Sequence, residues 1–563
     1  MTPADGQAAQ VRSLFERGWA LHQKQQLSEA LALYAQVLLR QPQHFDALHL
    51  SGIAAAQGRD LPRARDLMTR AIEAQPQHAV AYVNRGAVLQ DLGQWQAALA
   101  DYDSALARQQ GQPGEAESHN QRGTVLKELQ RYAEALASHD RAIALAPERA
   151  NFHNNRGIVL RLMGRYAQAL TAFDQALSLH PGYAQAFNNR ANTLNNLDRL
   201  PEALESYGQA IALQPDFATF HTNRGNILQE LQRPEAALQS YREALRLDRS
   251  DAHAHWCVSL GLLQLGRFDE GWPAYEYRWE RPGYRERRSA HFQRARWSGG
   301  PLNGQTILLH AEQGLGDTLQ FCRYAAEVAR LGGKVILEVQ TPLRTLMQRL
   351  PGVQQLLSPG DAVPAFDLQC PLLSLPLAFN TRGDTIPAAV PYLRASPEKI
   401  TQWQGALGPR IRPRVGLVWS GSSGHPHDRQ RSIALAEFLT LLPAGVQPVS
   451  LHKEVRDSDL PALRGRPDLL HFGEALTDFS DTAALCELVD VVVCVDTSVA
   501  HLAGALGRPV WLLLPVNPDW RWLLGRPDSP WYPRASLFRQ SVAGQWGDVL
   551  QDVRQALMQL SGA

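Results

Sequence analysis

The sequence lacks the features that hold together a small cross-linked protein or a membrane protein. It has only five cysteines in 563 residues, an odd number with no C-x-x-C spacing, so we expect reduced, buried thiols and no structural zinc site. No apolar run approaches the roughly 20 residues of a membrane span, and the first residues lack the basic and apolar segments of a signal peptide. These absences predict a cytoplasmic protein without a membrane span.

An excess of charge of one sign is missing as well. Lysine and arginine number 56 and aspartate and glutamate 55, which leaves a net charge of +1. No overall field then attracts nucleic acid, so we expect no nucleic-acid partner. The composition is that of a globular chain, because 44% of the residues are hydrophobic and the length allows about two to four domains with packed cores.

The N-terminal half repeats itself every 34 residues, apart from one spacing of 37. This period is that of tetratricopeptide repeats, in which each helix pair buries its apolar face only by stacking on its neighbours. Three ladders of residues follow the period: the prolines Pro42, Pro76, Pro113, Pro147, Pro181 and Pro215; the small residues Gly18, Gly52, Gly86, Gly123, Gly157, Ala191 and Gly225, with Ala30, Ala64, Ala98, Ala135, Ala169, Ala203 and Ala237; and the larger residues Tyr34, Met68, Tyr102, His139, Phe173, Tyr207 and Tyr241. We predict a repeat array over residues 10–282, with seven full repeats and a degenerate eighth.

Two positions depart from the repeat pattern. The wider spacing places three additional residues near 109–114, where Gly and Pro can form a larger loop, and the array should continue through it. The eighth repeat, from about Ser250, keeps Tyr275 but has Gly271 and Arg278 where alanines stand elsewhere. Terminal repeats are atypical because they face a different neighbour. We therefore predict that this repeat joins the array to the second half of the chain.

Amide side chains recur on the first helices of the middle repeats. Spaced one repeat apart, they could hydrogen-bond the backbone of an extended peptide without reading its side chains. They could equally satisfy hydrogen bonds between repeats or be solvated. The array resembles that of O-GlcNAc transferases, in which asparagines on the inner face of the superhelix hold the acceptor polypeptide. This resemblance implies acceptor contacts at Asn84, Asn120, Asn154, Asn155, Asn188, Asn189 and Asn223.

From Thr306 the pattern changes to short apolar runs that alternate with helical segments, as in parallel α/β sheets. The preceding arginine-rich junction, 283–299, carries aromatic residues that we expect to pack between domains. The predicted strands are 306–310, 334–339, 354–357 and 366–370 in a domain over 300–395, and 414–418, 447–451, 469–472, 491–495 and 510–514 in a domain over 414–540. A Gly/Pro-bearing hinge at 396–413 separates them, and residues 541–563 hold a C-terminal helix.

A strand, a tight turn and a helix follow one another at residues 488–510. The backbone N–H groups at such a helix start suit a diphosphate beyond the carboxyl end of the strand. The alternative is that Asp496 and Thr497 merely cap a structural helix. The segment Asp496-Thr497-Ser498-Val499-Ala500-His501, continued to Val510, resembles the nucleotide-sugar signature of the heptosyltransferase-like glycosyltransferases of family 9.

A second motif, Glu312-Gln313-Gly314-Leu315-Gly316-Asp317, extends this resemblance over roughly residues 300–540. It implies the GT-B fold, two Rossmann-like domains that face a cleft, with a C-terminal helix that packs back across the cleft. The fold class expected for the whole chain is thus an all-α repeat superhelix followed by an α/β GT-B unit. The resemblance also implies an inverting direct displacement in which Asp317 is the proposed base, although Asp317 could also be the cap of the following helix.

Glycosyl transfer needs positive charge or N–H dipoles to stabilise the leaving diphosphate. In addition to the 496–501 turn, the loop Ser420-Gly421-Ser422 is a candidate, and related enzymes carry a basic residue, often lysine, just before the helix that follows this loop, where this chain has Arg431. We find no His/Cys cluster with metal-ligand spacing, so we expect a reaction without a divalent metal and without a cofactor, in which the nucleotide sugar is a substrate. The candidate donor-binding residues are Gly314, Gly316, Ser420, Gly421, Ser422, Arg431, Lys453, Asp496, Thr497, Ser498, Val499, Ala500 and His501.

Together these features predict a glycosyltransferase that moves a sugar from a nucleotide sugar to a polypeptide held by the repeats. Flagellin or another surface protein is a candidate acceptor. One alternative is a transferase for a lipid-linked or polysaccharide acceptor, with the repeats docking a partner. Another is a repeat scaffold whose second half binds a nucleotide sugar without turnover, because repeats by themselves imply binding and not chemistry.

Overall fold

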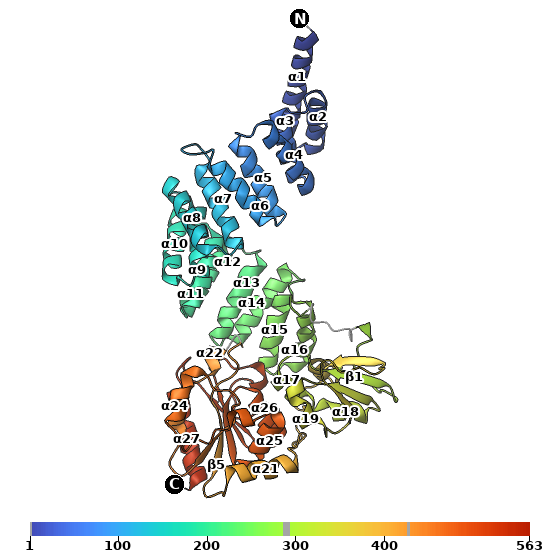
Figure 1. The fold of residues 1–563 in the computed structure, drawn as a ribbon, viewed down its shortest axis with the longest axis vertical. Coiled ribbons are helices and arrows are strands. Elements are labelled where there is room, and N and C mark those ends of the chain that lie inside the picture. Colours follow the sequence, from blue (N-terminus) through green and yellow to red (C-terminus); the bar gives the residue numbers. More distant parts are fainter. Residues whose placement is uncertain (1–2, 285–292, 425–427, 563) are drawn as a thin grey trace. The chain divides into compact units, whose positions relative to one another are not determined.

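The computed structural model describes residues 3–284, 293–424 and 428–562. It divides into two compact units, residues 1–227 and 228–563. The first unit is helical, and the second contains the last repeat helices and two parallel sheets (Figure 1). The predicted fold class, a helical repeat array followed by two α/β sheets of GT-B type, is confirmed. The predicted domain boundaries stay predictions.

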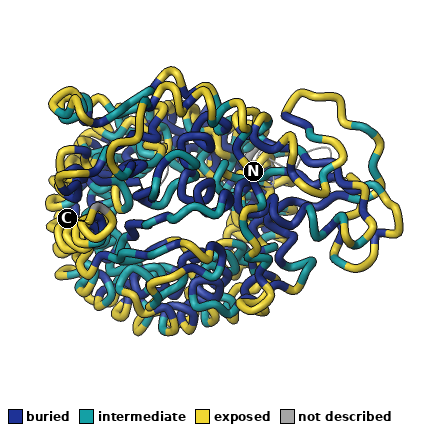
Figure 2. The backbone as a smooth tube through the Cα atoms, turned by 90° about the horizontal axis from the view of Figure 1, so that it is seen from below, coloured by how far each residue is buried: buried dark blue, intermediate teal, exposed yellow. Residues whose placement is uncertain are grey.

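The first unit contains the helix pairs α1–α2 to α11–α12, each formed by an odd-numbered helix and the helix after it, and the first part of α13. The helices are α1 (Pro3–Gln23), α2 (Leu27–Arg40), α3 (Phe45–Gln57), α4 (Leu61–Ala74), α5 (Ala79–Asp91), α6 (Trp95–Leu106), α7 (Glu115–Glu128), α8 (Tyr132–Leu145), α9 (Ala150–Leu162), α10 (Tyr166–Leu179), α11 (Ala184–Asn196), α12 (Leu200–Leu213) and α13 (Ala218–Glu230), the last of which crosses the boundary between the units. Buried and exposed residues alternate along each helix (Figure 2), as helices with one packed face require.

In the repeats, the small residue of the first helix packs against the large residue of the second helix. A Cβ atom on Gly157 would lie 2.6 Å from the ring of Phe173, and one on Gly123 would lie 2.7 Å from the ring of His139. The large residue of the second helix thus fills the space that the missing side chain of the first helix leaves. This contact repeats along the array and fixes how closely the two helices of a pair cross.

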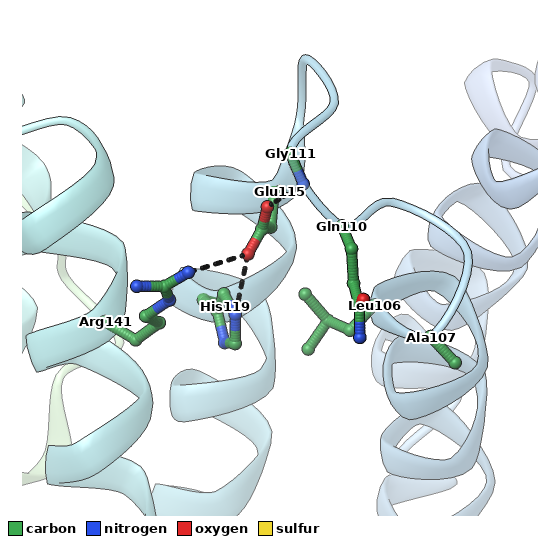
Figure 3. A pocket seen from close by; sticks show the side chains of 7 residues that line it. All are labelled: Leu106, Ala107, Gln110, Gly111, Glu115, His119 and Arg141. Carbon is green, nitrogen blue, oxygen red and sulfur yellow. Dashed lines mark hydrogen bonds and ion pairs between the residues drawn. The ribbon is translucent and has the colours of Figure 1, made fainter.

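The three additional residues of the 37-residue spacing form a loop between α6 and α7. Glu115, at the start of α7, accepts a hydrogen bond from the Gly111 backbone N–H at 2.7 Å and lies 3.4 Å from an Arg141 nitrogen and 3.7 Å from the His119 ring nitrogen (Figure 3). These contacts border a cavity of about 460 Å³ that is lined by Leu106, Ala107, Gln110, Gly111, Glu115, His119 and Arg141. Glu115 therefore fastens the enlarged loop to the following helices, and the array continues through it as predicted.

The second unit begins with the end of the repeat array and continues into two parallel sheets. The last repeat helices are α14 (Pro234–Leu247), α15 (Ala252–Gln264), α16 (Phe268–Tyr275) and the short helix η1 (Glu276–Glu280). The first sheet and its helices comprise β1 (Thr306–His310), α17 (Leu315–Phe321), α18 (Tyr324–Arg330), β2 (Lys334–Glu338), η3 (Thr341–Leu343), α19 (Arg344–Met347), β3 (Val353–Leu357), β4 (Leu368–Pro371), η4 (Leu372–Ser374) and α20 (Leu375–Ala378). The remaining elements, which include the second sheet, are α21 (Pro397–Leu407), β5 (Arg414–Val418), α22 (Asp428–Arg431), α23 (Leu435–Phe438), η5 (Leu439–Leu441), β6 (Gln447–Ser450), η6 (Asp457–Asp459), α24 (Leu460–Arg464), η7 (Gly473–Ala475), α25 (Phe479–Leu488), β7 (Val491–Val495), α26 (Ser498–Ala505), β8 (Val510–Leu514), η8 (Trp520–Trp522), β9 (Ala535–Arg539) and α27 (Gly547–Ser561). The sheet orders are β3-β2-β1-β4 and β6-β5-β7-β8-β9, and all pairs are parallel.

Most predicted strands are present, and the exceptions lie at the edges of the second sheet. Residues 469–472 make only an isolated bridge, between Val449 and Leu470. The fifth strand is β9, which the sequence analysis missed because its alternating burial and short length give a weak apolar signal. The Gly/Pro-bearing segment 396–413 contains helix α21, where Lys399 and Trp403 both donate to buried Asp481.

The last helix differs from the placement that the GT-B resemblance implied. Val553 and Leu557 of α27 are fully buried in a core with Val415 and Val493 of the second sheet. Arg554 donates to the carbonyls of Thr440 and Leu442 at 2.9 and 3.0 Å. The apolar face of α27 therefore covers the sheet of its own domain instead of packing back across the cleft.

The terminal repeat, which we expect to join the two halves, shares one core with both sheets. Phe268, Trp272 and Tyr275 of α16 are buried in this core. The Trp272 ring lies 5.3 Å from the Trp520 ring at an interplanar angle of 86°. In the junction, Trp297 is buried, in line with the predicted packing of the aromatic residues, whereas Arg285, Arg287, Arg288 and Phe292 lie outside the described residues.

Candidate active site

The two motifs singled out in the sequence meet in the second unit. α17 begins after the carboxyl end of β1 and α26 after that of β7, and the two helices pack together. A Cβ atom on Gly316 would lie 2.8 Å from Cδ2 of His501 and 3.5 Å from the Cα atom of Ser498. Gly316 is therefore the contact point at which the absence of a side chain lets the two helix starts approach.

Asp317 lies at the start of α17 and is held from two sides. Its Oδ2 accepts a hydrogen bond from the Gly314 backbone N–H at 2.7 Å, and its Oδ1 pairs with Nη2 of Arg521. The side chain keeps 17% of its surface exposed. Burial raises the pKa of Asp317, and the charge of Arg521 opposes this rise. The cap residue of α17 is therefore Gly314 and not Asp317, whose carboxylate binds the cap's backbone N–H from the third position of the helix. The role of Asp317 as a base stays a prediction.

Arg521 is a site residue that the sequence analysis did not single out. It lies in η8, is 7% exposed, and donates to Oε1 of Gln320 at 2.6 Å and to Oδ1 of Asp519 at 2.9 Å. Burial opposes its charge, but Asp519 and Asp317 outweigh burial and raise the pKa of the guanidinium above its usual value. A fixed cation thus lies beside Asp317. Only the fold brings it there, since exposed or loop arginines carry no sequence signal of a site.

His501 is buried in α26 and is not a free base. Its Nδ1 lies 2.8 Å from the Tyr532 hydroxyl, and its ring stacks on Trp522 with centroids 5.3 Å apart. Burial lowers the pKa of His501 well below its usual range, and Arg521 and Arg323 add to this effect. The imidazole is therefore neutral at pH 7, so one ring nitrogen can donate a hydrogen bond and the other can accept one, from Tyr532 or a polar ligand.

The turn before α26 has polar groups that protein atoms leave unsatisfied. Among the described residues, the buried Oγ1 of Thr497 and the buried Nε of Arg431 have no hydrogen-bond partner. Nη1 of Arg431 donates to the Asp496 carbonyl at 2.7 Å. Burial raises the pKa of Asp496 to about 6, and Asp519 contributes in the same direction. Unsatisfied buried donors and acceptors fit a polar ligand such as a diphosphate.

The glycine/serine loop after β5 lies at the same turn. A Cβ atom on Gly421 would lie 2.6 Å from Nη2 of Arg431, so the glycine makes room for the guanidinium. The loop is also held by Arg456, which the sequence analysis missed and which donates to the Gly421 carbonyl at 2.8 Å and to Asp428 at 2.6 Å. Ser420 is buried, and Ser422 is exposed.

The remaining predicted donor residues divide between this turn and other surroundings. Ser498 is half-buried at the start of α26, and Val499 and Ala500 are buried there. Exposed Lys453 instead donates to the Thr477 carbonyl at 3.2 Å, and none of its described bonds reaches the 496–501 turn. The diphosphate role of these residues stays a prediction.

Two carboxylates lie one residue apart at Asp457-Ser458-Asp459, and the second of them has a structural role. Asp459 is buried, and its carboxylate accepts from Nε1 of Trp419 at 2.9 Å and from the Leu435 backbone N–H at 3.0 Å. In the described part of the chain, no group of three or more His, Cys, Asp or Glu side chains is placed to hold a metal ion.

The asparagines of the repeats bond to one another across neighbouring repeats. Nδ2 of Asn155 donates to Oδ1 of Asn120 at 3.0 Å, Asn189 donates to Asn154 at 3.0 Å, and Asn223 donates to Asn188 at 2.9 Å. Asn84 lies 2.8 Å from a ring nitrogen of His49. Each bond uses one donor and one lone pair, and an amide has two donors and an acceptor oxygen with two lone pairs. The ladder is structural, and its acceptor-binding role stays a prediction.

Comparison with known proteins agrees with both halves of this architecture. Residues 14–79, 77–148, 148–216 and 218–251 match models of the tetratricopeptide repeat. Residues 475–514, which contain the 496–501 turn, match the model of glycosyltransferase family 9 (heptosyltransferase). The chain thus carries tetratricopeptide repeats followed by a glycosyltransferase family 9 domain, and the predicted resemblance is confirmed.

A curated relative of this chain is Protein FlbA of Caulobacter vibrioides, 27% identical over 325 residues. The match covers 53% of each protein, so the chain spans about half the length of the curated relative it matches. Among solved structures, a tetratricopeptide repeat protein from Parabacteroides merdae (18% identity, TM-score 0.39) covers 45% of this chain and 99% of its own. PilF of Pseudomonas aeruginosa (23% identity, TM-score 0.33) covers 37% of this chain and 94% of its own. Among the described residues, no helix has the length and apolar character needed to cross a bilayer.

Proposed function

We propose that this protein transfers a sugar from a nucleotide-sugar donor to a polypeptide acceptor bound by its repeats. The observation that carries the proposal is the meeting of Asp317, Arg521 and the 496–501 turn at the carboxyl ends of β1 and β7. In parallel α/β sheets, ligands bind at this edge. A carboxylate there can act as a base, and the nearby cations and N–H groups can stabilise an anionic leaving group.

In the proposed reaction an acceptor hydroxyl attacks the anomeric carbon of the donor. The new glycosidic C–O bond forms as the bond from the anomeric carbon to the phosphate oxygen breaks, and the configuration inverts. Asp317 takes the hydroxyl proton, and the nucleotide leaves with the bonding electron pair. Arg431 and the start of α26 would hold its phosphates, and the unsatisfied Nε of Arg431 and Oγ1 of Thr497 support this role.

The proposal of a polypeptide acceptor is based on the hydrogen-bonding capacity that the asparagine ladder leaves unused. After the ladder bonds are made, each amide still has donors or lone pairs that could bind a peptide backbone. A surface protein such as flagellin is the acceptor we propose to test first. Because the ladder bonds already occupy part of each amide, one alternative is that the repeats dock a partner while the sugar goes to a lipid-linked or polysaccharide acceptor.

The direct test is release of free nucleotide by the purified full-length protein from a panel of ADP-, UDP-, GDP- and CMP-linked sugars. Turnover of one donor, also in excess EDTA, is expected for a metal-independent transferase. Absence of turnover with every donor, while one of them binds by calorimetry, would instead indicate a nucleotide-sugar-binding scaffold. Mass spectrometry of cellular proteins with and without this gene then separates a protein acceptor, which gains the mass of the sugar, from a lipid or polysaccharide acceptor.

A further inference from the structure

Arg278 is a buried charge at a position that is apolar in every other repeat. Counting back by the repeat spacing, the equivalent residues are Ala244, Ala210, Ala176, Ala142, Ala105, Ala71 and Val37, each with no exposed surface. Arg278 is also 0% exposed. A small apolar residue suffices for stacking at this position, and a buried arginine is expensive unless it is paired. Its presence in the terminal repeat therefore calls for charged or polar partners.

The main partner is Glu312, the first residue of the motif that ends at Asp317. Nη2 of Arg278 lies 2.9 Å from Oε1 of Glu312, whose side chain is 4% exposed. Arg278 also pairs with Glu276 at 2.7 Å and donates to Oγ of Ser374 at 2.8 Å. All three guanidinium nitrogens are thus engaged. The planar fork of arginine can serve these groups together, which the single ammonium of lysine cannot.

A second contact from the same repeat holds the next residue of the motif. The hydroxyl of buried Tyr275 accepts a hydrogen bond from Nε2 of Gln313 at 3.1 Å. The backbone carbonyl of Gln313 accepts from Nε2 of Gln340 at 2.9 Å, so both the side chain and the backbone of Gln313 are held. The following residue, Gly314, donates its backbone N–H to Asp317. A continuous set of contacts therefore leads from the terminal repeat to the candidate base.

We propose that Arg278 and Tyr275 of the terminal repeat are positioning residues, which hold the 312–317 turn so that Asp317 points correctly at the acceptor. This inference rests on the proposed transferase function. In this arrangement the last repeat is a working part of the catalytic unit and not only the end of a binding array. A small displacement of a reacting group lowers rate strongly while it leaves ground-state binding nearly unchanged.

The test compares two conservative variants of the full-length protein, Arg278→Lys and Tyr275→Phe, with the control Arg242→Lys. The control changes an arginine of the preceding repeat that pairs with Glu270 at 3.2 Å on the surface. Nucleotide release is measured with the donor that the wild type turns over. We expect Arg278→Lys to lower kcat by at least about tenfold and Tyr275→Phe by a smaller factor, with KM within about twofold in both. The control should match the wild type.

Hydrogen–deuterium exchange gives a readout that needs no turnover. We expect residues 311–321 to exchange faster in both variants, while α26 and the thermal midpoint stay unchanged. Normal kcat and normal exchange in Tyr275→Phe and Arg278→Lys would overturn the positioning role. If Arg278→Lys does not fold, the result for Tyr275→Phe is the test. Loss of turnover in step with a general loss of protection would also overturn it, because that pattern is one of packing. A wild type without turnover on any donor overturns the proposed function, and the positioning role falls with it.

Discussion

Asp317 and Arg521 form an ion pair although 204 residues separate them in the chain. Arg521 is almost fully buried and also binds Asp519, whereas Asp317 keeps part of its surface exposed. The arginine therefore fixes one carboxylate oxygen and leaves the group open to a ligand. In the proposed mechanism this pair orients the base toward the hydroxyl of the acceptor.

We expect Asp317→Asn to reduce transfer about 10²–10⁴-fold and to leave the donor Kd within about threefold. The amide keeps an oxygen for the Gly314 N–H but cannot take a proton. Nucleotide release and calorimetry measure the two quantities. Asp519→Asn is the matched control, because it changes the other carboxylate on Arg521 and should keep most of the activity. Turnover by Asp317→Asn above roughly a tenth of the wild-type value would contradict the assignment.

The two candidate cations for the diphosphate should behave differently. Arg431 lies against Gly421 and the Asp496 carbonyl, so Arg431→Ala should weaken donor binding by about 1.5–3 kcal/mol, the range for a charge-assisted hydrogen bond. Lys453→Ala should weaken it less, since that ammonium already binds the Thr477 carbonyl at the surface. Calorimetry with the donor decides. Equal donor affinity of the wild type and Arg431→Ala would move the phosphate site elsewhere.

The asparagine ladder should contribute to the stability of the repeats whether or not it binds a peptide. Changing Asn154, Asn155, Asn188 and Asn189 together to alanine removes three ladder bonds of about 0.5–1.5 kcal/mol each, so the thermal midpoint should fall. Donor hydrolysis should persist. If the ladder binds the acceptor, transfer to protein should fall by at least about tenfold.

A control of similar stability separates the two roles of the ladder. Asp140→Ala with Asp174→Ala removes the ion pairs to Arg156 and Arg190, which also link repeat helices but lie outside the ladder. Comparable transfer by the two variants at matched thermal midpoints would show that the ladder is structural only. A crosslinking map of the acceptor would then be needed to locate its binding surface.

Asp481 makes the second unit sensitive to acid. Although burial opposes its charge, the hydrogen bonds from Lys399, Thr477 and Trp403 lower the pKa of Asp481 to about 2, below its usual value of 3.8. The folded state therefore favours the ionised form. The resulting stability is fully present above the unfolded pKa and is lost as the pH falls through the folded one, between about pH 4 and pH 2. We expect Asp481→Asn to have a lower thermal midpoint than the wild type at neutral pH. On acidification, the thermal midpoint of Asp481→Asn should fall less than that of the wild type. Parallel pH profiles of the two proteins would contradict this.

The sequence by itself determined the repeat array, most strands of the two sheets and the two motifs. These features depend on local patterns of residues. Helix pairs need a small residue where the helices cross, as Gly157 does against Phe173, and buried parallel strands need unbroken apolar runs such as 491–495. The edge strand β9 was not predicted from the sequence, because a strand that is only partly buried has a mixed composition. The site glycine Gly316 was found for its motif, while its contact with His501 was not foreseeable.

Only the tertiary structure decided which distant residues meet. It paired Asp317 with Arg521 and Arg278 with Glu312, and it turned Lys453 to the Thr477 carbonyl. Such pairs have no period or spacing in the chain, because they form where separately folded helices and sheets pack and where a buried charge must find an opposite one. The repeat asparagines are the intermediate case: their spacing was visible in the sequence, but only packed neighbouring repeats could show that they bond to one another.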